Sequence, residues 1–313
     1  MRKKRKPLNQ HSRTNSDLPQ CAPDEDNPDP EAWCLCCLKQ STLNNIGRLP
    51  CLRRKIIDSS LFRTTGHIPY FDPIALTGPD YGGFCVPKIW AADSPIKTLS
   101  LTQGHGTVLH LRVREFKAPQ GGNAFLDSRG RSIYAVPWAL ADAEDAVSSV
   151  KAFIEVSMDA YLDRYTHDFD EISRLVFGAV REYSRASNCE ERSLFRDLLR
   201  FWTAARFIEG GWRCEGPEKL NADKLPDPLN PPLLVAPPPY VDFQLAAVVM
   251  ERVLKPLQGR ILTALEKLVF TGRARNWFPI FLVIFVLLQG YELAFAHEVA
   301  WTRKRRYLVS CLQ

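Results

Sequence analysis

Apolar positions in the second half of the chain recur every three to four residues, the spacing that places side chains along one side of an α-helix. Five segments after Pro137 have this pattern, and each is long enough for a helix of a compact domain. Asp142 stands where a carboxylate can cap the first of them or interact with its dipole. The predicted helices are residues 141–164, 170–184, 189–207, 241–270 and 277–306.

Prolines divide and bend this helical half. Residues 225–239 contain too many prolines for a helix, so we expect a connector that runs along the surface between the third and fourth helices. Within the fourth helix, Pro256 has no backbone N–H to donate. We therefore expect a kink near Arg252 and Val253.

A different period marks the region before Pro137. Residues 107–116 alternate apolar with polar or charged side chains, which predicts a strand. Residues 132–136 are its expected partner, because glycines in the intervening loop supply turn chemistry. Residues 66–95 contain prolines and glycines too often for regular elements, so an irregular surface segment is expected there.

The most hydrophobic stretch is residues 278–288, near the C-terminus. Its continuous apolar run is about half of the ~20 residues that a bilayer needs, and Gln289 and Glu292 interrupt the apolar character after Leu288. We therefore expect a buried helix of a soluble core, with a membrane anchor over residues 278–295 as the alternative. The large side chains expected to form one inward face are Trp277, Phe281, Ile284, Phe285, Leu288, Tyr291 and Phe295.

Composition places the chain among ordinary globular proteins, with 45% hydrophobic and 24% charged residues over 313 positions. The formal net charge of +6 is concentrated at the two ends. Such basic clusters bind nuclear import receptors, phosphates or anionic lipid, or else form solvated tails. The basic residues at the two ends are Arg2, Lys3, Lys4, Arg5 and Lys6, and Arg303, Lys304, Arg305 and Arg306.

The cysteines indicate a reducing compartment. The basic N-terminus is followed by polar residues and prolines rather than by a secretory signal, and the nine cysteines are scattered apart from one cluster. Cys34 and Cys37 form a CxxC pair, and Cys51 downstream could join them around zinc. Free, packed thiols are the alternative, since no second CxxC is present.

Motifs of catalysis are missing from the sequence. It has no GxSxG elbow, no phosphate-binding GxxxxGK[ST] loop and no metal spacing between its six histidines. His105 lies between two glycines, but this short string predicts a turn before a strand rather than a ligand loop. We expect no enzyme; a metabolite-binding or enzymatic helical domain is retained as an alternative, because acid–base pairs can come from distant helices.

The strings that carry a resemblance to a known family are residues 34–37, 49–53, 58–63, 89–90, 97–103, 207–212, 239–242 and 277–292. Together they resemble a family of fungal transcription factors that carry a zinc binuclear cluster or a related cysteine module. The resemblance implies a small zinc-held head that reaches DNA and a large helical body for regulation or partner contact. The head departs from the family pattern, which has six cysteines with basic residues between them.

The sequence therefore predicts a mainly α protein: a helical regulatory body with a small β element and a disordered N-terminal head. The expected parts are a head over residues 1–32, a cysteine-bearing basic segment over 33–65, an irregular segment with the β element over 66–138, and the body over 139–313. Arg53, Arg54 and Lys55 are expected to contact phosphate. We expect a nuclear regulator with protein partners, weak DNA contact and no membrane insertion; the residues give no oligomeric state.

Overall fold

The fold is described from a computed structural model, which describes residues 56–59, 61, 90–117, 124–126, 132–134, 136–221 and 235–310. For residues 58, 124–126, 132–134 and 298–310 only the backbone is described. The predicted disordered head, most of the cysteine-bearing segment and most of residues 66–95 lie outside these ranges.

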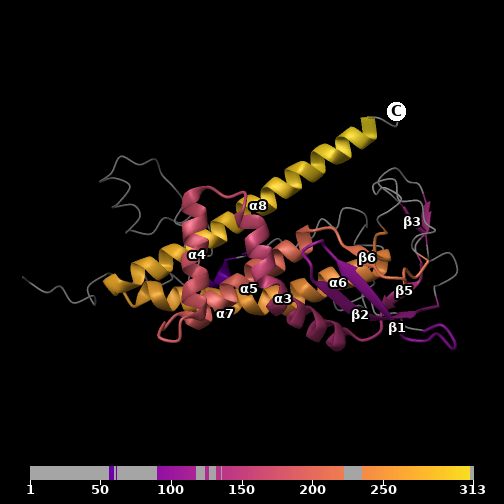
Figure 1. Cartoon of the computed structure of the whole chain (residues 1–313), viewed down its shortest axis with the longest axis horizontal. Helices are drawn as coiled ribbons and strands as arrows, with labels where there is room; N and C mark the ends of the chain where they lie inside the picture. Colours follow the sequence, from indigo (N-terminus) through magenta and orange to yellow (C-terminus); the bar gives the residue numbers. More distant parts are fainter. Residues whose placement is uncertain are drawn as a thin grey trace, which may run out of the picture. The chain divides into compact units, whose positions relative to one another are not determined.

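Helices dominate the described chain, as predicted (Figure 1). They are α3 (Ala143–Thr166), α4 (Glu171–Arg185), α5 (Arg192–Glu209), α6 (Pro239–Val249), α7 (Lys255–Phe270) and α8 (Trp277–Ser310), with short helical turns at η2 (Ile56–Asp58) and η5 (Ala274–Asn276). Asp142 caps α3 as predicted: its carboxylate accepts a hydrogen bond from the backbone N–H of Asp145 at 2.8 Å.

The predicted disturbance before Pro256 takes the form of a π-helical turn, η4 (Met250–Leu254), which joins α6 to α7. Proline cannot complete the hydrogen bond to the carbonyl of Arg252, and a wider turn lets the helix continue past it. The prolines before α6 act differently, since Pro239 occupies its first turn, where an N–H has no helical partner.

Four antiparallel strands form the main sheet, in the order β5-β2-β1-β6. They are β1 (Lys97–Thr102), β2 (Val108–Glu115), β5 (Trp138–Leu140) and β6 (Arg213–Glu215). The alternation predicted for residues 107–116 is confirmed, because Leu109, Leu111 and Val113 of β2 are buried while the side chains between them face outward. This buried face packs against α3, beside which the sheet lies in Figure 1.

The predicted partner of this strand was wrong. Residues 132–134 form β4 (Ser132–Tyr134), which pairs with β3 (Ala124–Leu126) in a separate two-stranded sheet. The partner of β2 is instead β1, which packs Leu99 and Leu101 into the same core. The alternation of leucine with threonine and serine over residues 97–102 carried this signal, and a five-residue turn suffices to connect the two strands.

The core is built around α5, which contacts α3, α4, α6, α7 and α8. Large buried side chains line this helix, among them Phe195, Leu198, Leu199, Trp202 and Phe207. Its C-terminal end lies beside the turn between β1 and β2, where Gln103 donates hydrogen bonds to the carbonyls of Phe207 and Gly210. One central helix therefore connects the sheet with the C-terminal helix.

Candidate partner-binding surface

One side of α8 holds the helix to the rest of the body. Leu282, Val283 and Val286 have exposed fractions of 1%, 0% and 1%. They lie on the side that faces α4, α5 and α7, where Phe278 and Phe285 are partly buried against the core. Burial of this inner face ties the helix to the body through ordinary hydrophobic packing.

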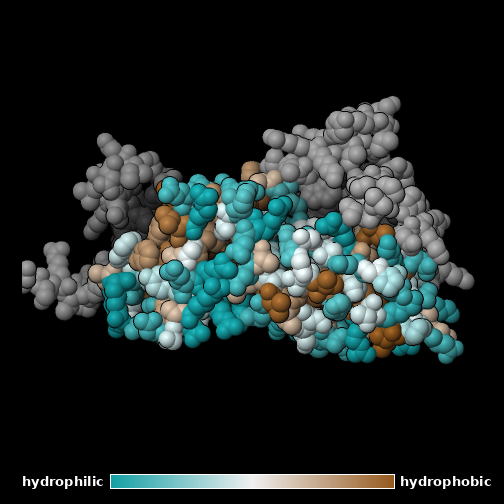
Figure 2. Space-filling view, in the orientation of Figure 1, coloured by the Kyte–Doolittle hydropathy of each residue, from teal (hydrophilic) through white to brown (hydrophobic). Residues whose placement is uncertain are grey.

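The opposite side of α8 is apolar as well, and it faces outward. We call this row of six side chains the α8 stripe; each is 42–66% exposed. Brown and tan side chains gather where α4 and the first half of α8 lie in Figure 2. The α8 stripe consists of Trp277, Phe281, Ile284, Leu288, Tyr291 and Phe295.

The prediction that these side chains point inward was therefore wrong. Residues 277–288 are apolar almost all around the helix, so a period of 3.6 fits either face equally well. The face that is buried consists of shorter aliphatic side chains, which allow α8 to lie close to its neighbours. At Gly290 the helices pack in ordinary contact, since a Cβ there would lie 3.7 Å from the side chain of Trp202 on α5.

One aromatic side chain of α4, Tyr183, lies next to the start of α8. The rings of Tyr183 and Phe278 are 6.2 Å apart, and the ring of Phe278 stacks on that of Phe281 at 6.4 Å. Ile172 and Leu175, in the first turns of α4, are 65% and 67% exposed. Exposed apolar areas of this kind are typical of interaction sites.

A buried arginine of α5 binds the backbone of α8. Arg206 of α5 is 1% exposed, and its guanidinium donates to the carboxylate of Glu209 at 2.5 Å and to the carbonyl of Gly290 at 3.1 Å. Burial raises the pKa of Glu209 to about 7, although the charge of Arg206 opposes this rise. Burial also lowers the pKa of His297, and the nearby Arg206 lowers it further.

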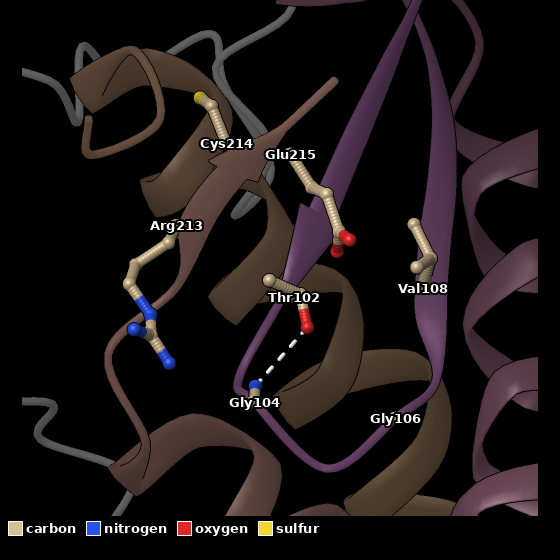
Figure 3. Close-up of a pocket in the computed structure, with 7 residues that line it drawn as sticks. All are labelled: Thr102, Gly104, Gly106, Val108, Arg213, Cys214 and Glu215. Atoms are coloured by element: carbon tan, nitrogen blue, oxygen red, sulfur yellow. Dashed lines mark hydrogen bonds between the residues drawn. The ribbon is translucent and has the colours of Figure 1, made fainter. Parts of the chain in front are cut away.

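The predicted turn at His105 is confirmed, with Gly104 and Gly106 at positive φ. The imidazole lies against the ring of Tyr161, with 4.6 Å between the ring centroids. An open hollow of about 360 Å³ lies beside the turn. Figure 3 shows Arg213 and Glu215 at its rim and the hydrogen bond from the N–H of Gly104 to Thr102. His105 does not line this hollow.

An arginine groove of about 570 Å³ lies along α5, beside Arg260 of α7. Its arginines are held by carboxylates: Asp197 accepts from Arg200 at 3.0 Å and from Arg260 at 2.6 Å. Burial alone would raise the pKa of Asp197, but these hydrogen bonds hold it below its usual value. Asp197 therefore joins α5 to α7 through ion pairs. The four arginines that line the groove outnumber the two carboxylates that pair with them in the described chain, Asp197 and Glu155, so the groove keeps a positive charge.

The predicted zinc, phosphate-contacting and nuclear-localisation residues lie outside the described part of the chain. They are Cys34, Cys37 and Cys51; Arg53, Arg54 and Lys55; and Arg2, Lys3, Lys4, Arg5 and Lys6. Within the described ranges, no group of three or more histidine, cysteine, aspartate or glutamate residues is placed to hold a metal ion. The two cysteines described there, Cys189 and Cys214, are half-buried and far apart in the sequence.

By length and composition, one segment of the described chain could cross a membrane: Ala274–His297, 24 residues long. Only 17% of its most apolar stretch is buried. The length and apolarity of this segment thus agree with the membrane-anchor alternative. The inner face of α8, however, is already packed against the protein core.

A helical body that presents an apolar helix face outward is typical of proteins that bind other proteins. The family model described as "KpeA transcription factor" matches residues 78–309, most of the chain. The chain belongs to the KpeA transcription factor family. It is thus a transcription factor rather than an enzyme, and its family indicates DNA or protein partners and a nuclear role. No curated protein and no solved structure matches it significantly.

Proposed function

We propose that the chain regulates transcription mainly by binding another protein through the α8 stripe, while the N-terminal segment adds weak, zinc-dependent contact with DNA. The observation that carries this proposal is the outward row of six large apolar side chains on a helix whose other face is fixed in the core. Aromatic side chains make up four of the six, and such residues are enriched at the centres of protein interfaces.

The DNA-contacting part of the proposal rests on sequence. Cys34, Cys37 and Cys51 would hold zinc, and the basic run Arg53, Arg54 and Lys55 comes after the last of them. Three adjacent cations give a modest contact with phosphate, which weakens as salt rises. A partner bound by the body would then add to this weak attachment to chromatin.

Localisation of a tagged full-length chain, combined with recovery of chromatin, tests this function. We expect the wild type in the nucleus and on chromatin, and the chain lacking residues 2–6 largely in the cytosol. Ile284→Glu, which places a charge in the stripe, should enter the nucleus but no longer restore the transcript levels of a strain that lacks the gene. Val156→Glu is the matched control, since Val156 is an exposed apolar residue of α3 outside the stripe, and it should restore them.

Two results would contradict the proposal. If the wild-type chain were recovered in carbonate-resistant membranes, Ala274–His297 would be an anchor. If Ile284→Glu restored transcript levels as well as Val156→Glu does, the stripe would have no part in regulation.

A further inference from the structure

The spacing of the α8 stripe is that of a helix–helix seam. Its members succeed one another at intervals of four, three, four, three and four residues along the sequence. This is the 3.5-residue period of a heptad repeat, in which apolar side chains of two helices interlock. We propose that the stripe is a dimerisation seam and that its occupant is the stripe of a second copy of this chain; the inference rests on the proposed function and names the partner.

The inner face of α8 argues against a bilayer as the occupant. A membrane-spanning helix turns apolar side chains to lipid on all sides, but Leu282, Val283 and Val286 are already buried in the core. Moving α8 into a membrane would expose their partners on α5 and leave the charge of Arg206 without the carbonyl of Gly290. A partner helix covers the outer stripe without disturbing these contacts.

The intervals also make the stripe complementary to itself in an antiparallel arrangement. The series four, three, four, three, four is the same in both directions, and its centre lies at Val286. A two-fold axis there would place Ile284 opposite Leu288, Phe281 opposite Tyr291, and Trp277 opposite Phe295. Such an isologous contact closes at two copies, so it would not propagate into a filament.

Charge favours the antiparallel orientation. α8 continues to Ser310 and contains Arg303, Lys304, Arg305 and Arg306 in its last turns. In a parallel pair the two basic clusters would lie ~10 Å apart, the usual distance between packed helices. In the antiparallel pair they would be separated by roughly 50 Å, at 1.5 Å per residue from the centre of the seam, well beyond the screening length in physiological salt.

The exposed area of the α8 stripe is just large enough for a specific dimer interface. Side chains of this size, about half exposed, offer roughly 100 Å² each, or roughly 600 Å² per copy. Two copies would bury roughly 1,200 Å², the lower end of the range for specific interfaces. We therefore expect a dimer that dissociates on dilution.

Sedimentation velocity of the purified full-length chain over a range of concentrations tests the inference. The wild type should pass from monomer to dimer as the concentration rises, and Val156→Glu should give the same curve. Ile284→Glu and Leu288→Glu should weaken dimerisation roughly 100-fold or more, because each dimer would bury two unpaired carboxylates. Far-UV circular dichroism checks that every variant is folded.

The outcomes separate this inference from the proposed function. A wild type that stays monomeric, together with an Ile284→Glu variant that fails to restore transcripts, would overturn the dimer and leave a different protein as partner. Dimers that persist in both stripe variants would place the contact elsewhere and overturn the inference. Flotation of the wild type with phosphatidylcholine vesicles would overturn both proposals.

Discussion

Gln103 is a buried polar side chain that links three parts of the fold through hydrogen bonds. It is 9% exposed, its amide N–H donates to the carbonyls of Phe207 and Gly210, and its amide oxygen accepts a hydrogen bond from the hydroxyl of Tyr161. These bonds tie the turn after β1 to both α3 and the end of α5. Since Gln103 stands in a loop between two strands, sequence reasoning assigned it no role.

Removal of the Gln103 amide should lower the free energy of unfolding, by an amount that depends on Tyr161. Gln103→Leu leaves a buried hydroxyl and two carbonyls without their partner, at about 1–3 kcal/mol of unfolding free energy. Adding Tyr161→Phe removes the stranded hydroxyl, so the double variant should be about 1 kcal/mol more stable than the sum of the single changes predicts. Urea unfolding measures this. Tyr165→Phe, in the same ring cluster, should combine additively with Gln103→Leu; additivity for Tyr161→Phe as well would disprove the coupling.

Glu209 should make stability depend on pH. Burial raises its pKa from 4.5 to about 7, so between these values the folded state retains a proton that the unfolded state releases. The contribution of Glu209 to stability is therefore complete below about pH 4.5 and is lost as the pH rises towards 7. At 1.36 kcal/mol per pKa unit the loss amounts to about 3 kcal/mol.

Glu209→Gln isolates this effect. Its free energy of unfolding should vary less between pH 5 and pH 8 than that of the wild type, whatever the absolute stability of the variant. Asp242, whose pKa is raised by burial to about 6, acts in the same direction as Glu209, whereas Glu155 and Asp197, whose pKa values are lowered by arginines, act in the opposite direction and at lower pH. All three are present in both proteins, so the comparison isolates Glu209. Parallel pH profiles for the two proteins would show that Glu209 does not titrate in this range.

At the scale of elements, the positions of the helices were predictable and the side on which one of them packs was not. The 3.6-residue period and the prolines located α3, α4, α5 and the turn before Pro256, because each amphipathic helix has only one apolar side. α8 has two, and the choice between them depends on the shape of the surface that α5 offers. That shape arises from the tertiary structure, so it cannot be predicted from the spacing of apolar residues within α8.

Truncation of one leucine on each side of α8 tests its orientation. Leu282→Ala, at a position 1% exposed, should lower the free energy of unfolding by about 2–5 kcal/mol, because it leaves a cavity in the core. Leu288→Ala, at a position 63% exposed, should change it by less than about 0.5 kcal/mol at low protein concentration. Urea unfolding of both variants gives the answer. The reverse order would mean that the stripe is the buried face.

The whole molecule combines a described body with a head known only from its sequence. The resemblance to transcription factors agrees with the class of protein that the comparison identifies, while the zinc cluster type stays a prediction. The spacing of the cysteines does not decide whether zinc binds, because three irregularly spaced cysteines can hold zinc only if the fold of the head brings them together. Residues that lie close in the sequence do not establish that geometry.

Zinc content decides this point. We expect the purified full-length chain to bind zinc and to lose it in Cys34→Ser and Cys37→Ser, since each removes one thiolate ligand. Cys214→Ser is the control, because Cys214 lies in β6 within the body and should leave the zinc content unchanged. Near-zero zinc in the wild type, measured by atomic emission, would contradict the metal site.

The last turn of α5 connects two distant parts of the body through hydrogen bonds on either side. Gln103 binds the carbonyls of Phe207 and Gly210 from the direction of the sheet, and Arg206, in the same turn, binds the carbonyl of Gly290 on α8. Detachment of α8 would strand a buried cation beside the carbonyls that anchor the strand turn. The C-terminal helix and the sheet should therefore come apart in a single cooperative step, and a disturbance at the outer surface of that helix should reach the turn between β1 and β2.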